Sequence, residues 1–438
     1  MKTDVLIVGC GCSGLYCALH LPRDKKILMI TKSDLESSDS FLAQGGMCML
    51  KDESDYQCYF EDTLKAGHYE NDKKSVEIMI HSSQDVVKDL LSYGVDFKRN
   101  ADGSLAFTRE GAHRHKRILY HEDITGKEIT SCLLEQVKKL PNVTLLTYTR
   151  LLDILEGDNT CCGAVIKQQD QAPEVVEAGD VVLATGGIGG LYRHSTNFRH
   201  LTGDSVAIAI KHGIALKNVN YVQIHPTTFY SENEEDRSFL ISESVRGEGA
   251  KLYDKEMHRF VNELLPRDLL TNAIYAQMEK DHTAHVWEDL RTIPADELRA
   301  HFPNIIEHCT EMGYDVFKEC IPVVPAQHYY MGGIQVNYQS RTSMERLYAV
   351  GETACNGVHG KNRLASNSLL ESLVFAKRAA REISENNGRV PADAEAQREK
   401  VLASADLSAY SDEKALDQVY KDAVQREIQK ADKLARTA

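Results

Sequence analysis

The fold is decided by the stretch DVLIVGCGCSG, which runs from Asp4 to Gly14. Its first half is a short continuous apolar run, the pattern of a strand buried on both faces of a sheet. Its second half, Gly9–Gly14, is a G-x-G-x-x-G turn. Helical periodicity follows over Leu15–Leu21, and the apolar run Lys26–Ile30 predicts a second strand. Strand, glycine turn, helix and strand in this order predict a Rossmann-like α/β unit that binds a nucleotide.

The glycine turn suits a pyrophosphate, because glycines let the backbone approach closely and a helix N-terminus carries partial positive charge. Thr31 and Lys32 follow the second strand, where an NAD enzyme usually has an acidic residue that binds the ribose. This departure disfavours an NAD-dependent enzyme.

Two later segments return to the same buried-strand pattern. Gly179–Leu183 runs into a glycine pair, and Arg346–Val350 runs into Gly351 and Glu352. The stretch between them is long enough to form an inserted domain, and the chain from Arg389 has helical spacing. We predict a discontinuous dinucleotide-binding domain over 1–218 and 329–388, a capping domain over 219–328, and a helical segment over 389–438.

Composition narrows the class of protein. The 438 residues are 42% hydrophobic and 26% charged, which is ordinary for a globular chain. A net charge of −14 disfavours binding to nucleic acid, so an anionic substrate must be held by a few focused cations. We see no apolar run long enough for a membrane span and no Cys-x-x-Cys among the 11 cysteines. We therefore expect no metal site, free thiols and a cytoplasmic location.

Several motifs together resemble one known family. They are Ser40–Gly46 (SFLAQGG), Thr108–Gly111 (TREG), His225–Thr227 (HPT), Glu243–Gly249 (ESVRGEG), Pro266–Asp268 (PRD), His328–Tyr329 (HY) and Asn362–Glu371 (NRLASNSLLE). Over about residues 3–385 the chain resembles the fumarate reductase/succinate dehydrogenase flavoprotein family. The resemblance implies a Rossmann-like FAD-binding domain, an inserted α+β capping domain and a short helical C-terminal segment.

Within that family, the TREG stretch and the ASNS…E end of the last motif are most similar to the branch that oxidises L-aspartate to iminoaspartate, the first step of NAD biosynthesis toward quinolinate. The resemblance implies that O2 or fumarate re-oxidises the flavin, and that quinolinate synthase is a functional partner. A soluble fumarate reductase or succinate dehydrogenase-type subunit is the alternative. A flavin-binding or dicarboxylate-sensing protein without turnover is a third hypothesis.

The resemblance also implies the residues that bind FAD. They are Gly9, Cys10, Gly11, Cys12, Ser13, Gly14, Lys32, Ser40, Ala43, Gln44, Gly45, Gly46, Thr185, Gly186, Gly187, Asp204, Glu352, Ser368 and Leu369. Relatives with covalent flavin use a histidine five residues before the loop glutamine, where this chain has Asp39. We therefore expect non-covalent FAD. Asp204 and Ser368 could instead act only as helix caps.

A four-carbon dicarboxylate needs cationic or hydrogen-bonding groups at both ends. Arg363 can form a bidentate fork to one carboxylate, and His225 and His328 supply donors of adjustable charge. Family resemblance adds Ser242 to the substrate site. A carboxylate at Glu110 would favour a substrate that carries an ammonium group. Taken alone, either histidine could be purely structural.

The catalytic residues implied by the resemblance are Glu243, Arg246 and Arg267, as a proton-transfer chain that ends at Arg267. Arg267 could also act only electrostatically, and Arg246 could be a simple ion-pair partner of Glu243 or Glu248. We interpret His113 and His115, in the basic stretch that ends at Arg117, as solvated. Lys361 stands where the family usually has alanine, and this extra cation could shift pKa values in the site.

Overall fold

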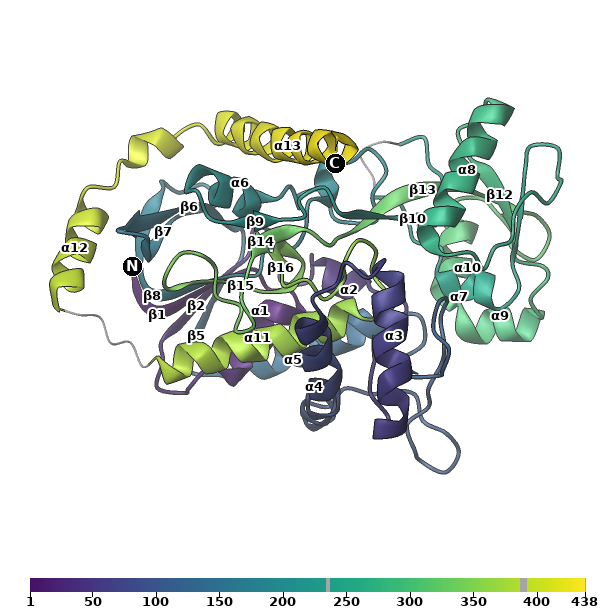
Figure 1. Ribbon diagram of the computed structural model, residues 1–438, viewed down its shortest axis with the longest axis horizontal. Coiled ribbons are helices and arrows are strands. Elements are labelled where there is room, and N and C mark those ends of the chain that lie inside the picture. The colour runs from purple at the N-terminus through teal and green to yellow at the C-terminus, as the bar shows by residue number, and fades with distance from the viewer. Residues whose placement is uncertain (234–236, 387–391, 438) are drawn as a thin grey trace.

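The first predicted strand lies inside a sheet. The structure, a computed structural model, describes residues 1–233, 237–386 and 392–437 (Figure 1). Within these residues one seven-stranded sheet has the order β5-β2-β1-β8-β7-β6, with β15 paired to β8. Its strands are β1 (Lys2–Val8), β2 (Ile27–Ile30), β5 (Val143–Leu146), β6 (Thr149–Gly157), β7 (Thr160–Gln168), β8 (Glu174–Leu183) and β15 (Leu347–Ala349). Because β2, β8 and β15 all pair in parallel within it, the predicted Rossmann-like fold is confirmed.

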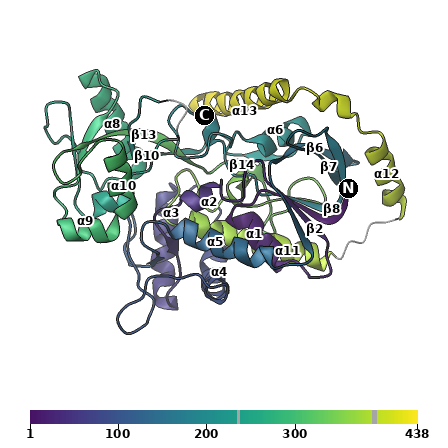
Figure 2. The same cartoon turned by 180° about the vertical axis from the view of Figure 1, so that it is seen from behind.

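Alternate residues of β1 face opposite layers, as the pleat of a strand requires. Val5 and Ile7 pack into the layer of α1 (Cys12–His20), α4 (Lys73–Ser92), α5 (Thr125–Lys138) and α11 (Ser368–Glu385). Leu6 and Val8 pack against α6 (Asp204–Lys211) on the other side. Figure 2 shows α1, α5 and α11 together on one face. The sheet is therefore covered on both faces, which explains the unbroken apolar run.

Gly9 ends β1 in a conformation that only glycine adopts easily. Its φ is +115°, and a Cβ there would lie 2.1 Å from the carbonyl oxygen of Ala184. The close approach lets the glycine turn sit directly beside the end of β8. The helix α1 then begins at Cys12 and not at Leu15, because apolar periodicity does not report the first turn with Ser13 and Gly14.

A second sheet lies at one end of the molecule, at the right of Figure 1. Its order is β10-β13-β12-β11, from β10 (Val222–Phe229), β11 (Lys251–Tyr253), β12 (Val286–Asp289) and β13 (Ile321–Tyr330). The helices beside it are α7 (Glu243–Gly247), α8 (Arg267–Asp281), α9 (Ala295–His301) and α10 (Pro303–Glu311). This region has a separate apolar core that includes Phe229, Leu270 and Ile305. The predicted boundary at residue 328 falls inside β13, and the division into domains stays a prediction.

Further elements lie outside these two sheets and the helices already named. They are α2 (Asp39–Leu42), α3 (Tyr56–Ala66), β3 (Met47–Cys48), β4 (Ile118–Leu119), β9 (Leu216–Lys217), β14 (Gly333–Gln335), β16 (Ala354–Cys355) and the 3-10 turns Glu53–Asp55, Gly189–Leu191, Gly351–Thr353 and Leu407–Tyr410.

The C-terminal segment forms α12 (Ala392–Ala403) and α13 (Glu413–Thr437). Figure 1 shows α13 running along α6, and Val424 belongs to the core on that side of the sheet. The Tyr420 hydroxyl donates to the carbonyl of Leu152 at 2.6 Å, which ties α13 to β6. The predicted helical tail is therefore part of the sheet's outer layer. None of the helices within the described ranges is long and apolar enough to cross a membrane.

Candidate active site

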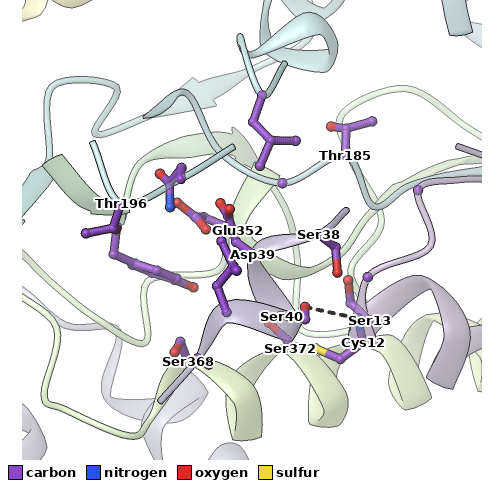
Figure 3. A pocket seen from close by; sticks show the side chains of 18 of the residues that line it. Cys12, Ser13, Ser38, Asp39, Ser40, Thr185, Thr196, Glu352, Ser368 and Ser372 are labelled. Atoms are coloured by element: carbon purple, nitrogen blue, oxygen red, sulfur yellow. Dashed lines mark hydrogen bonds between the residues drawn. The ribbon is translucent and has the colours of Figure 1, made fainter. Parts of the chain in front are cut away.

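One long cavity runs from the glycine turn to the predicted substrate residues. Figure 3 shows part of its wall, where Asp39, Glu352 and Ser368 face a common space. The predicted cofactor residues that line it are Gly9, Cys10, Gly11, Cys12, Ser13, Lys32, Ser40, Ala43, Gln44, Gly45, Gly46, Thr185, Gly186, Asp204, Glu352, Ser368 and Leu369. The predicted substrate and catalytic residues that line it are Glu110, His225, Ser242, Glu243, Arg267, His328 and Arg363. The fold thus brings residues far apart in the chain to one site.

Three predicted residues do not line this cavity. Gly14 packs against the turn itself, where a Cβ would lie 2.1 Å from the carbonyl oxygen of Gly9. Gly187 makes room for Glu352, whose Oε1 would be 2.3 Å from such a Cβ. Arg246 lies behind the cavity and donates to the carbonyl of Glu263 at 2.7 Å. Gly14 and Gly187 allow neighbouring groups to pack closely. Arg246 affects the cavity only through residues next to it, such as Glu243.

At one end of the cavity, Lys32 replaces the usual ribose-binding acid. Its ammonium donates to Asp204 at 2.9 Å and to the carbonyl of His200 at 2.9 Å. Arg150 lies 3.4 Å from the same carboxylate, and the Thr202 hydroxyl donates to it at 2.8 Å. Burial opposes ionisation of Asp204, but Lys32 and Arg150 lower its pKa. Asp204 is therefore the shared anion of a small cationic cluster and is more than a helix cap.

The middle of the cavity holds two buried acids. Burial raises the pKa of Asp39 to about 7, and burial together with Asp39 raises the pKa of Glu352 to about 8. Asp39 accepts from the backbone N–H of Phe198 at 3.1 Å, and Glu352 accepts from that of Tyr330 at 2.8 Å. A neutral Glu352 carboxyl can donate as well as accept a hydrogen bond.

At the other end lie the two arginines. The Arg267 guanidinium donates from Nε to Glu243 Oε2 at 2.6 Å and from Nη1 to Gln223 Oε1 at 2.9 Å. Arg363 donates from Nη1 to the Ser368 hydroxyl at 2.9 Å and lies over the Tyr329 ring at 4.5 Å. Burial and the charge of Arg267 lower the pKa of Arg363 to about 10. The two cations share one region of low dielectric, which favours an anionic ligand there.

Two histidines lie beside these arginines. The rings of His225 and His328 are 5.2 Å apart between centroids. Burial and nearby arginines lower the pKa of each well below its ordinary value, so both rings are neutral without a ligand. His225 Nδ1 lies 2.8 Å from the carbonyl of Thr227, and His328 Nδ1 lies 2.8 Å from the Thr196 hydroxyl. Their Nε2 atoms remain available to a ligand.

Glu110 is a further acid that lines the same cavity as these groups. It is buried, and the Ser366 hydroxyl donates to its Oε2 at 2.5 Å. Burial and the charge of Glu243 raise its pKa. Burial opposes ionisation of Glu243 too, but Arg267 and Arg246 lower the pKa of Glu243 to about 2. The site therefore combines the cations Arg267 and Arg363 with the Glu110 carboxyl, whose pKa depends on its burial and on the charge of Glu243.

Comparisons with known proteins show the family and the fold of this chain. Residues 4–369 match the FAD binding domain family. The chain is 49% identical over 381 residues to an L-aspartate oxidase of Clostridium perfringens, covering 87% of this chain and 86% of that one. It is 39% identical to one of Neisseria meningitidis, covering 94% and 83%. A mutant of E. coli quinol fumarate reductase FrdA has a similar structure, with a TM-score of 0.84, 30% identity, and coverage of 92% and 74%.

The chain belongs to the L-aspartate oxidase family. Its cavity fits the FAD of that family, because several residues that line it carry a buried polar atom without a protein partner. They are Ser38 Oγ, Asp39 Oδ2, Gln44 Oε1 and Asn197 Oδ1. Unsatisfied groups of this kind are rare in native proteins unless a ligand or water meets them. FAD would offer hydroxyl, phosphate and ring partners to such atoms.

Reasoning from the sequence missed part of the cavity of this L-aspartate oxidase family member. Thr196, Asn197 and His200 line it from the loop after the glycine pair, and Arg150 and Arg237 line it from two other segments. The polar run Ser195–Asn197, in the loop that follows the buried strand and its glycine pair, was the available signal. Arg150 and Arg237 had none, because neither lies in a recognisable motif.

Three interpretations of charged residues need correction. Neither Glu243 nor Glu248 pairs with Arg246 within the described residues, since Glu243 binds Arg267 and Glu248 binds His301. Lys361 is 57% exposed and lies 3.9 Å from Glu70, so it points away from the cavity.

The basic stretch is solvated only in part. His113 and Arg117 are 5% and 0% exposed, whereas Arg114, His115 and Lys116 between them are exposed. Arg117 is buried because acidic side chains of the Glu53–Asp55 turn and of α3 pair with it.

Proposed function

We propose that this protein oxidises L-aspartate to iminoaspartate with FAD, as the first step of NAD biosynthesis toward quinolinate. The observation that carries the proposal is the carboxylate of Glu110 in the same cavity as Arg267 and Arg363. L-aspartate has two carboxylates and one ammonium, and this set of charges is complementary to it. Succinate has no cation for Glu110 to pair with.

Arg363, His225 and His328 bind the substrate carboxylates in this proposal. Arg363 is held by Ser368 and stacked on Tyr329, so little side-chain freedom is lost when it binds. A carboxylate beside the two neutral histidines favours their protonation, which adds donors as the substrate arrives. Ser242 lines the same region and is already the N-cap of α7. These contacts fix the direction of the substrate Cα–H bond.

The cavity would hold FAD, which would supply a two-electron acceptor for the hydride that leaves the substrate Cα. Gly9–Ser13, with Gly14 packed behind, would hold its pyrophosphate. Lys32 and Asp204 would hold the adenosine side. Glu352, Ser368 and Leu369 would hold the flavin side, where the N-terminus of α11 favours negative charge.

Arg267 and Glu243 act next to the reacting carbon in this proposal. The 2.6 Å bond to Glu243 holds the Arg267 guanidinium at the wall of the cavity. Arg267 would then polarise the substrate or relay a proton toward Glu243. Arg246 lies behind Glu243 and helps to keep it ionised, so its role is electrostatic.

We further propose that the FAD is bound non-covalently. Asp39 occupies the position of the covalent histidine, and its carboxylate forms no histidyl–flavin link. Acid precipitation of the protein should leave yellow FAD in the supernatant. Yellow colour that stays with the precipitate would contradict this proposal. The 11 free cysteines suit a reducing compartment, and on that ground we propose a cytoplasmic enzyme that delivers its product to quinolinate synthase.

The alternative is a soluble fumarate reductase or succinate dehydrogenase-type flavoprotein. The likeness to FrdA and the two arginines favour it, because fumarate also carries two carboxylates. Fumarate could thus be an electron acceptor of the same site, in place of O2, which would give H2O2.

Anaerobic reduction of the bound flavin separates these hypotheses. L-aspartate should bleach the visible flavin absorbance, and succinate should not. Bleaching by succinate alone would favour the alternative. No bleaching by either compound would favour a binding protein without turnover.

A further inference from the structure

Ser366, the residue that holds Glu110, has a strained backbone. Its φ is +61°, which is uncommon for a residue other than glycine. Such a conformation costs free energy and persists only where the surroundings hold it in place. Ser366 lies between Arg363 and Ser368, and its hydroxyl donates to Glu110. The contacts that hold this turn therefore decide where the Glu110 carboxylate points.

One backbone N–H and two side chains form hydrogen bonds with residues 365–367 of this turn. The backbone N–H of Cys48 donates to the carbonyl of Ser366 at 2.9 Å. The Tyr59 hydroxyl donates to Asn367 Oδ1 at 2.7 Å. His113 Nε2 lies 3.0 Å from the carbonyl oxygen of Ala365. His113 is the one of these groups that comes from the same loop as Glu110.

The partners of His113 leave it only one neutral form. Arg117 Nη1 lies 2.9 Å from His113 Nδ1, and a guanidinium can only donate. Nδ1 is therefore the acceptor, and the proton sits on Nε2, from which it is donated to Ala365. Burial lowers the pKa of His113 to about 4, so the ring stays neutral near neutral pH.

Arg117 is itself immobile. Its side chain is 0% exposed and binds both oxygens of Asp55, at 2.9 and 3.0 Å, and Asp62 at 2.8 Å. It also lies 4.9 Å from the Tyr59 ring centre. This buried cluster fixes the position of His113 Nδ1, and so the direction of the Nε2–H bond toward Ala365.

We propose that His113 is a positioning residue that sets the preference of the site for an amino-dicarboxylate. It does so by holding the Ala365–Ser366 turn, so that the Ser366 hydroxyl stays on Glu110 and the carboxylate faces the substrate ammonium. His113 does not line the cavity and contacts no substrate. The inference rests on the proposed oxidation of L-aspartate, because it concerns the group that selects for the ammonium.

Two amide variants test this role. His113→Gln can place an oxygen toward Arg117 and an N–H toward Ala365, as the neutral imidazole does. His113→Asn keeps the acceptor for Arg117 but is too short to reach Ala365. His115→Leu is a control on the same loop, since His115 contacts Asp55 with an exposed side chain. FAD content and thermal midpoint are measured for each protein.

The main measurements are KM and kcat for L-aspartate oxidation and for fumarate reduction. Loss of the buried bond to Ala365 should raise the KM for L-aspartate about tenfold in His113→Asn. Its KM for fumarate should change less than about threefold, because fumarate does not use Glu110. His113→Gln and His115→Leu should stay within about threefold of wild type for both substrates.

The outcomes distinguish the inference from the proposed function. A wild-type protein that does not oxidise L-aspartate refutes the function itself. Suppose instead that the wild type oxidises L-aspartate. The positioning role is then overturned if His113→Asn has the same ratio of the KM for L-aspartate to the KM for fumarate as the wild type, or if it loses activity equally with both substrates. Failure of His113→Gln to restore the ratio also overturns it, as does loss of FAD in both amide variants.

Discussion

Gly111 lies against Glu243 so closely that a Cβ at residue 111 would come within 1.9 Å of Glu243 Oε1. The glycine follows Glu110, the acid proposed to select the substrate, and Glu243 binds Arg267. The loop that carries Glu110 and the start of α7, which carries Glu243, are therefore packed without a side chain between them. A small change at Gly111 should act directly on the Glu243–Arg267 pair.

Gly111→Ala should lower kcat for L-aspartate about 10–100-fold while FAD stays bound. The added methyl group displaces the end of Glu243, and Arg267 then loses its 2.6 Å partner. Gly247→Ala is the matched control, because a Cβ there meets nothing within 4 Å. Steady-state kinetics check both variants. Equal activity of the two alanine variants would falsify the role of close packing at Gly111.

Glu110→Gln should lower kcat/KM for L-aspartate about 10–100-fold and change fumarate reduction less than about threefold. The amide keeps the shape and the bond to Ser366 but loses the charge that meets the substrate ammonium. Both rates are measured on the same protein sample. Equal losses with the two substrates would remove Glu110 from the selection of the substrate.

Dicarboxylate binding should take up protons near neutral pH. His225 and His328 have pKa values well below the ordinary value in the empty site, because of burial and the nearby arginines. A bound anion raises both pKa values, so the complex binds more protons and the affinity falls as pH rises. Calorimetric titration of fumarate in buffers of different ionisation enthalpy measures the uptake. His225→Gln should reduce it, and zero uptake in the wild type contradicts the prediction.

Arg117→Met should reduce the free energy of unfolding by about 3–5 kcal/mol, because it leaves Asp55 and Asp62 buried without their cation. Arg114 also pairs with Asp62 but is 56% exposed, and Arg114→Met should cost at most about 1 kcal/mol. Urea unfolding measures both.

The pH dependence gives a second check on Arg117. Burial opposes ionisation of Asp55 and Asp62, but Arg117 still lowers the pKa of both. A lowered carboxyl pKa stabilises the fold above the unfolded value of about 4, and that stability is lost as pH falls through the folded pKa. The difference between wild type and Arg117→Met should therefore narrow in acid. A constant difference would argue against the ion pairs as its cause.

Local spacing was enough for four strands of the sheet, and the family resemblance indicated many of the residues of the cavity. The strand, turn and helix around Gly9 depend on residues that are neighbours in the chain, so the pattern of apolar residues and glycines reports them. Motifs such as Ser40–Gly46 and Asn362–Glu371 then indicated which distant segments meet at one cofactor. Arg267, Arg363 and His328 do line one cavity with Glu110.

The sequence by itself thus determined the fold class, the family and many of the residues that line the cavity. Only the tertiary structure decided which charged side chains are buried and with whom they pair. Arg117 is buried because it pairs with Asp55, which is 62 residues away in the chain. Lys361 is exposed because its side chain turns toward Glu70. The strain at Ser366 and the contact of Gly111 with Glu243 are of the same kind. Such pairings depend on the packing of distant segments, and no local pattern of residue types encodes them.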